Sequence, residues 1–163
     1  MQRWRFYWNF AVPYLGANLR ARINEIRLAK CVKMNKSDLE ERLIKFAVLI
    51  IAIAESTPNT RSANHLSGQL LRSGTSPALN YGEAQSAESR NDFVHKIKIV
   101  LKELRETFVC LRIIYRSNFF KAEDEIQSAI KEADELIAIF VKSAQTAMKN
   151  NQESIETSKI KNR

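Results

Sequence analysis

The chain has 163 residues, which is the length of one ordinary domain and enough to bury a hydrophobic core without staples. Hydrophobic residues make up 45% of it and charged residues 27%, and this composition excludes bulk disorder. The 4 Gly and 3 Pro are too few for the turns of a many-stranded fold. The 2 Cys and 2 His are too few for a disulfide framework or a zinc cluster.

Most of the net charge of +8 lies in the first fifth of the chain, because residues 1–33 hold seven bases and one acid, a net of +6. The same segment holds six of the 14 aromatic residues, without the continuous apolar run of a secretory signal or a membrane span. Two interpretations stay open. Residues 1–33 form an irregular basic, aromatic arm that lies on a membrane or on nucleic acid, or they are upstream sequence and translation begins at Met34.

The first predicted helix begins at Ser37, because Ser37 and Glu40 have the spacing of a capping box. Nine uninterrupted apolar residues follow at positions 46–54, too few to cross a bilayer. A helix that is apolar on all sides must be covered on more than one side. The pattern therefore predicts burial in a bundle and against another subunit, and residues 56–60 predict a turn.

A second helix is predicted to begin after Ser62. Its apolar stripe consists of Leu66, Leu70, Ser73, Pro77, Tyr81 and Ala84. Pro77 lacks a backbone donor, so we expect a kink there or a break near Ser76. The small residues Ser73 and Gly74 would let a neighbouring helix approach closely.

The third and fourth helices are predicted over residues 89–116 and 122–148 from apolar residues in alternating steps of three and four. The predicted core positions are Phe93, Ile97, Val100, Leu104, Phe108, Leu111 and Tyr115 in the third helix and Ile126, Ile130, Ala133, Ile137, Phe140 and Ala144 in the fourth. Residues 151–163 predict a polar, frayed tail. Four helices with short turns predict an all-α, antiparallel up-down-up-down four-helix bundle over residues 34–150.

Several short sequence motifs follow one another along the predicted helices. Residues 71–84 read LRSGTSPALNYGEA, residues 89–93 read SRNDF, and residues 102–107 read KELRET, with further matches at 42–47 and 135–137. Together they resemble the bacterial four-helix-bundle family first noticed in intervening sequences of 23S ribosomal RNA genes. The match runs over about residues 37–148 and includes none of 1–33, which favours a start at Met34.

The resemblance implies a left-handed up-down-up-down bundle that assembles as a homopentameric ring. It implies no catalytic activity. Related bundles act as basic accessory proteins beside nucleic acid or a reverse transcriptase, so the family analogy suggests a role at RNA or DNA.

Four polar residues follow one flank of the second helix beside its apolar stripe: Arg72, Ser76, Asn80 and Glu83. One interpretation is a polar groove for a ligand or partner. The other is a hydrogen-bonded seam that fixes helix register or a subunit contact, because buried polar groups at helix interfaces commonly specify one arrangement.

Five bases share one broad face of the third helix: Lys98, Lys102, Arg105, Arg112 and Arg116. Residues 96–121 hold seven bases and two acids, whereas residues 122–148 hold six acids and two bases. The stripe is suited to tracking phosphates of RNA or DNA. Alternatively, the basic face of the third helix and the acidic face of the fourth attract each other, either within the bundle or between the subunits of a ring.

Acidic pairs give a third alternative. Glu103 with Glu106 and Glu132 with Glu135 have the spacing of carboxylate clusters in all-helical, Mg²⁺-dependent nucleotide pyrophosphohydrolases. We expect Glu135 to point almost opposite the core, which is typical of a solvated face. The pair Asp92 and His95 lacks the second motif of a di-iron site. No catalytic, metal or cofactor site is therefore assigned, and Cys110 is expected to be a packed thiol.

These observations predict a non-enzymatic, oligomeric interaction protein of the cytoplasm that needs no cofactor and does not enter a membrane. Its expected partners are further copies of the chain, five in all if the resemblance holds, and RNA or DNA as an accessory protein. The alternatives are a self-assembling scaffold without nucleic acid and the Mg²⁺-dependent hydrolase.

Overall fold

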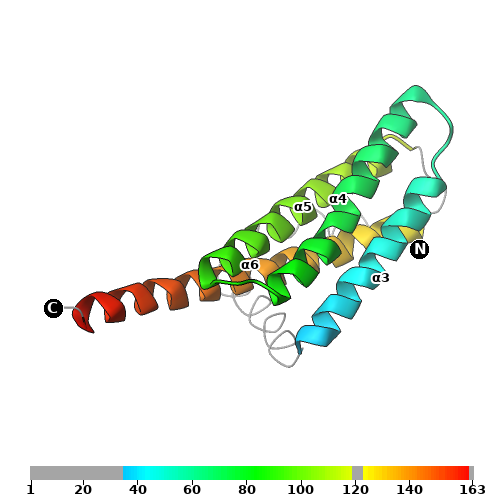
Figure 1. Ribbon diagram of the computed structural model, residues 1–163. Coiled ribbons are helices and arrows are strands. Elements are labelled where there is room, and N and C mark those ends of the chain that lie inside the picture. Colours follow the sequence, from blue (N-terminus) through cyan, green and yellow to red (C-terminus); the bar gives the residue numbers. More distant parts are fainter. Residues whose placement is uncertain (1–34, 119–122, 162–163) are drawn as a thin grey trace, which may run out of the picture. The chain divides into compact units, whose positions relative to one another are not determined.

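The computed structural model describes residues 35–118 and 123–161, which form four α-helices. In chain order these are α3 (Lys36–Glu55), α4 (Arg61–Gln85), α5 (Arg90–Arg116) and α6 (Glu123–Lys161). Figure 1 shows the four helices lying lengthwise beside one another. The predicted extension 1–33 and the proposed start at Met34 lie outside the described residues.

The helices pack as a closed square of neighbours. α4 packs against α3 and α5, α5 packs against α6, and a thinner contact between α6 and α3 closes the bundle. A Cβ atom on Gly74 would touch Ile50, and one on Gly82 would lie 3.9 Å from Glu40, so residue numbers rise along α3 as they fall along α4. The predicted antiparallel four-helix bundle is confirmed, with α3 and α5 at diagonally opposite corners.

The first helix begins two residues earlier than predicted. Its N-cap is Asn35, whose Oδ1 accepts from the backbone N–H of Asp38 at 2.8 Å, while Asp38 Oδ2 accepts from the N–H of Asn35 at 3.3 Å. The capping box is thus Asn35–Asp38 and the predicted Ser37–Glu40 pair is wrong, because Asn and Asp cap at least as well as Ser and Glu.

The next two helix starts are likewise set by caps. α4 is capped by Thr60, whose hydroxyl accepts from the N–H of Ala63 at 3.2 Å, rather than starting after Ser62. α5 is capped by Ser89, as predicted. Its last turn ends before Asn118, whose φ of 52° is the left-handed conformation that often terminates helices.

α4 continues without a break through Pro77. An interior proline costs about 3 kcal/mol because it removes one backbone hydrogen bond and crowds the preceding turn. Here the Pro77 ring is buried in the core face, beside the buried small residues Ser73 and Gly74, and its burial offsets part of that cost. The alternative of a break near Ser76 is therefore wrong.

The core faces of α5 and α6 are rotated slightly from the predicted stripes. Phe93 and Phe108 are only half-buried and Tyr115 is exposed, whereas Val94, Leu101, Cys110 and Ile114 are buried instead. In α6 the buried residues include Ala129 and Leu136 rather than Ile130 and Ile137. Long helices with apolar residues in adjacent registers permit this, because an α-helix drifts about 20° per heptad from a strict 3.5-residue repeat.

α6 runs to Lys161 rather than ending near Met148 with a frayed tail. Residues 149–161 contain neither Gly nor Pro, so nothing in the local sequence terminates a helix that is already nucleated. Figure 1 shows these C-terminal turns, in red, extending past the other helices. Among the described residues, no helix is long and apolar enough to cross a membrane.

Candidate interaction surfaces

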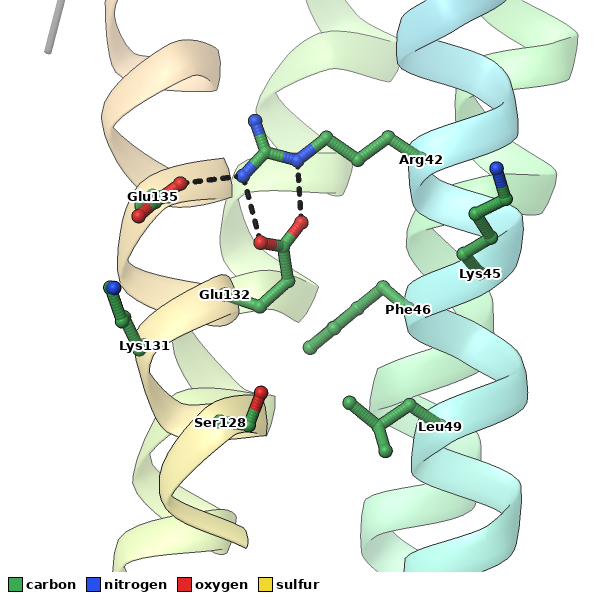
Figure 2. Close-up of a pocket in the computed structure, with 8 residues that line it drawn as sticks. All are labelled: Arg42, Lys45, Phe46, Leu49, Ser128, Lys131, Glu132 and Glu135. Atoms are coloured by element: carbon green, nitrogen blue, oxygen red, sulfur yellow. Dashed lines mark hydrogen bonds and ion pairs between the residues drawn. The ribbon is translucent and has the colours of Figure 1, made fainter. Parts of the chain in front are cut away.

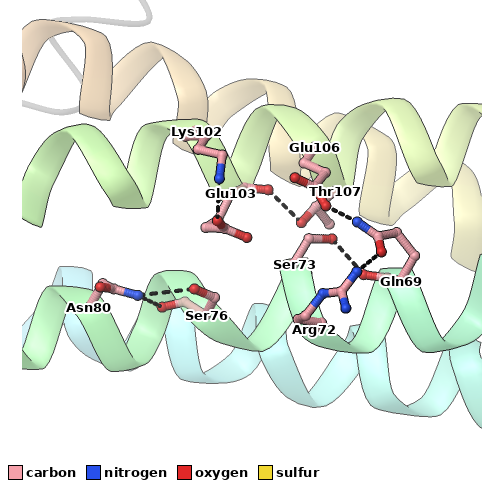
Figure 3. A network of polar contacts seen from close by, with 9 residues as sticks. All are labelled: Gln69, Arg72, Ser73, Ser76, Asn80, Lys102, Glu103, Glu106 and Thr107. Atoms are coloured by element: carbon pink, nitrogen blue, oxygen red, sulfur yellow. Dashed lines mark hydrogen bonds and ion pairs between the residues drawn. The ribbon is translucent and has the colours of Figure 1, made fainter.

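A chain of polar contacts joins α4 to α5 (Figure 3). The Gln69 side-chain amide donates to the Glu106 carboxylate, and the Arg72 guanidinium donates to Gln69 Oε1. The fully buried hydroxyl of Ser73 donates to the carbonyl of Gln69 at 3.0 Å. Arg72 is therefore tied to α5 through Gln69, a residue that the sequence analysis missed although it lies one turn before Arg72.

The other members of the predicted flank are also engaged. Asn80 Nδ2 donates to both the hydroxyl and the carbonyl oxygen of Ser76, each at 3.0 Å. Glu83 Oε2 lies 2.5 Å from Lys96 Nζ on α5, and this contact raises the pKa of Lys96. The structure thus brings the four predicted residues to the α4–α5 junction, where Arg72 and Glu83 connect the helices and Ser76 and Asn80 bond to each other.

The five predicted bases of α5 are all exposed. Lys102 lies 3.5 Å from Glu103, and the Arg112 guanidinium stacks on the Phe108 ring at 5.4 Å from its centroid. Two apolar side chains interrupt the stripe: Val109 is 52% exposed and Ile113 is 45% exposed. We call Val109 and Ile113 the α5 patch. The α5 patch was not predicted from the sequence, although both residues lie at helical spacing between the bases.

A second exposed apolar row lies on α3. Ile44, Val48 and Ile51 are 45%, 60% and 43% exposed, and their spacing of four and three residues places them one above another. We call this row the α3 stripe. The bundle buries the other side of the helix, where Leu43, Ile50 and residues of the same face lie. The sequence pattern predicts that the apolar run 46–54 is covered on more than one side. The bundle by itself covers only part of that run.

An open cleft of ≈ 380 Å³ lies between α3 and α6 (Figure 2). Arg42 Nε lies 2.5 Å from Glu132 Oε1, and Arg42 Nη2 lies 2.8 Å from both Glu132 Oε2 and Glu135 Oε2. The hydrogen bond that Arg42 donates to the Glu132 carboxylate is the main cause that raises the pKa of Arg42 above its usual range. Phe46 and Leu49 point from α3 toward α6 in the same cleft.

Residues 35–142, which include parts of all four helices, match the model of the 23S rRNA-intervening sequence protein family. The chain belongs to this family. It is similar to a solved structure from Bacteroides thetaiotaomicron, described as a protein of unknown function from the S23 ribosomal protein family. The two are 30% identical, with a TM-score of 0.62, and the match covers 69% of this chain and 99% of that one. A search of curated proteins finds no significant match.

The predicted resemblance to the 23S rRNA-intervening sequence family is confirmed, and every candidate residue lies inside the matched range. In this family member the pair Glu103 and Glu106 and the pair Glu132 and Glu135 do not converge on a common site. Glu132 and Glu135 bind Arg42 of α3, whereas Glu106 binds Gln69 of α4. Within residues 35–118 and 123–149, no group of three His, Cys, Asp or Glu side chains is placed to hold a metal ion.

The predicted orientation of Glu135 is wrong, because its carboxylate reaches Arg42 instead of pointing away from the bundle. The shift of the α6 core to Leu136 turns Glu135 toward the α3 side. His95 is exposed, as expected of a solvated histidine.

Cys110 is buried as a packed thiol in this family member, and its S–H donates to the carbonyl of Leu66 at 3.4 Å. Burial, with a smaller contribution from Glu106, raises the pKa of Cys110 to about 11. Because the thiolate is the reactive form, this thiol stays protonated and inert near neutral pH.

Proposed function

We propose that this 23S rRNA-intervening sequence family member is a non-enzymatic interaction protein that works as a homo-oligomer. The α3 stripe is the observation that supports the proposal. Single exposed apolar residues are ordinary, but Ile44, Val48 and Ile51 form a continuous row on one helix face. Docking of another copy there would remove these side chains from water, at about 25 cal/mol for each Å² of apolar surface buried.

A structural rather than catalytic role for the half-buried acids fits the same proposal. Glu132 and Glu135 neutralise Arg42, and Glu106 accepts from Gln69. Each of these carboxylates joins one helix to another. A hydrolase of the all-helical kind would instead need carboxylates that converge on one Mg²⁺.

The proposal is tested by the native mass of the full-length chain, measured by light scattering coupled to size exclusion over a wide concentration range. We expect a mass that is a defined multiple of 18.8 kDa, and five times this mass if the assembly is the pentamer that the family resemblance implies. Nuclease treatment should leave this mass unchanged. A monomer at every concentration would contradict self-assembly.

A second candidate function is that of an RNA- or DNA-associated accessory protein, and the exposed bases of α5 favour it. Lys98 and Arg116 lie 18 residues apart, which is about 27 Å along a helix and long enough to follow several phosphates. Of the five bases, only Lys102 has a carboxylate oxygen within 4.0 Å among the described residues. Within the part of the chain that the structure describes, the other four have no such partner.

Replacing both Lys102 and Arg105 with Glu is expected to weaken RNA binding at least tenfold at moderate salt. It should also reduce the slope of log affinity against log salt by about two, because two phosphate contacts are lost. Fluorescence anisotropy with a labelled RNA at several salt concentrations measures both quantities.

The matched control replaces Lys36 and Lys142, two exposed lysines away from α5, with Glu. This variant has the same net charge, so it separates a local contact from general attraction. An equal loss of affinity in both variants, or no RNA binding by the unaltered chain, would argue against a nucleic-acid surface on α5.

A further inference from the structure

We propose that copies of this chain join head to tail, with the α3 stripe of one copy docked on the α5 patch of the next. This inference rests on the proposed self-assembly and names the two surfaces that carry it. Both surfaces consist of large apolar side chains that remain exposed on the bundle: Ile44, Val48 and Ile51 on one and Val109 and Ile113 on the other.

The positions of the two helices favour a head-to-tail contact over a two-fold one. α3 and α5 do not pack against each other and stand at opposite corners of the bundle, so their outer faces point in different directions. A two-fold contact through α3 would pair the α3 stripe with itself and leave the α5 patch in water. A contact between unlike surfaces covers both in every copy, and such contacts build rings or filaments. It also covers the α5 bases, so this pairing and a nucleic-acid surface on α5 exclude each other.

The charges around each surface oppose self-pairing. Glu41 and Glu55 lie at the two ends of the α3 stripe, 14 residues or about 21 Å apart. Lys45, the base beside this row, contacts Glu41 at 3.4 Å, but both side chains are exposed and such a surface pair is weak, so Glu41 still acts as an acid at this end of the stripe. An antiparallel pair of α3 helices centred on Val48 would therefore bring Glu41 of each copy close to Glu55 of the other, and like charges facing each other are unfavourable.

The α5 patch has the complementary charge at the same spacing. Lys102 and Arg116 also lie 14 residues apart, and Arg105 and Arg112 lie between them beside Val109. Two α5 faces would repel each other, whereas an α3 face with acids at its ends attracts an α5 face with bases at its ends. Apolar contact supplies the attraction and charge selects the unlike pairing.

Two single variants test the pairing in the full-length chain. Val48→Lys places a base in the α3 stripe, where it would face the bases of α5. Val109→Glu places an acid in the α5 patch, where it would face the acids of α3. Each variant is expected to be monomeric by light scattering at a concentration at which the unaltered chain is fully assembled, with unchanged helix content by circular dichroism.

Mixing the two variants gives the decisive result. The Val48→Lys chain keeps an intact α5 patch and the Val109→Glu chain keeps an intact α3 stripe, so a complex containing equal amounts of both chains should appear only in the mixture. Leu79→Glu is the matched control, because Leu79 is an apolar residue of α4 with 68% exposure that belongs to neither surface, and this variant should assemble normally.

The outcomes separate the inference from the proposed function. A monomeric unaltered chain would overturn self-assembly and this pairing together. An unaltered chain that assembles, with Val109→Glu assembling equally well or with no mixed complex, would overturn the pairing and leave self-assembly standing. Loss of assembly in Leu79→Glu would also overturn the pairing, because the contact would then involve α4.

Discussion

Replacing Gly74 with Ala is expected to destabilise the bundle by about 1–3 kcal/mol, the usual cost of overpacking a core. A Cβ atom at this position would lie 2.5 Å from Ile50 Cγ2 and 3.0 Å from Ile50 Cγ1. Ile50 is fully buried and β-branched, so it cannot rotate away at low cost. Urea unfolding followed by circular dichroism measures the change in the free energy of unfolding.

Gly68→Ala is the matched control in the same helix. Nothing lies within 4 Å of a Cβ atom at Gly68, so the usual helix propensity should dominate and stabilise the protein by about 0.5–1 kcal/mol. Combining Gly74→Ala with Ile50→Ala should cost less than the sum of the single changes, because the smaller residue 50 leaves room for the new methyl group. If both glycine replacements were stabilising, the close approach of α3 to α4 would be wrong.

Arg42→Met is expected to destabilise the protein by about 1–3 kcal/mol. The change keeps an unbranched apolar stem in the α3–α6 cleft but leaves Glu132 and Glu135, which are partly buried, without their shared base. Hydrogen bonds to charged groups contribute about 1.5–3 kcal/mol when buried, and partial exposure to solvent reduces that figure. Urea unfolding again measures the effect.

Two further variants identify the cause of that loss. Lys45→Met removes an exposed base of the same helix, whose contact with Glu41 contributes at most about 0.5 kcal/mol. Adding Glu132→Gln and Glu135→Gln to Arg42→Met should recover part of the stability, because the uncompensated carboxylates cause much of the loss. An effect of Arg42→Met no larger than that of Lys45→Met would show that the ion pairs do not hold α3 to α6.

The candidate surfaces differ in how far they could be predicted from the sequence. The side of the helix on which residues such as Arg72, Asn80 and Lys102 lie follows from their spacing alone, whereas their roles in binding stay predictions. The partners of those residues were not predictable in the same way. Gln69 and Lys96 meet Glu106 and Glu83 only because α4 and α5 pack in one particular register.

The ion pairs of Arg42 show the same limit at longer range. Arg42 and Glu132 are 90 residues apart in the chain, and no periodicity links them. Their contact depends on the thin α3–α6 packing and on the choice of Leu136 over Ile137 as a core residue. That choice arises from side-chain packing in three dimensions, so periodicity alone predicted the wrong orientation for Glu135.

For residues 35–118 and 123–161, the sequence by itself determined the four helices, the turns between them and the family, because these depend on local periodicity, turn-forming residues and the order of motifs along one chain. Only the tertiary structure decided that α4 passes through Pro77 unbroken, which neighbouring apolar register each helix buries, and that Ile44, Val48, Val109 and Ile113 remain in water. These features depend on competition between nearly equivalent apolar faces, and only packing against the other three helices resolves that competition.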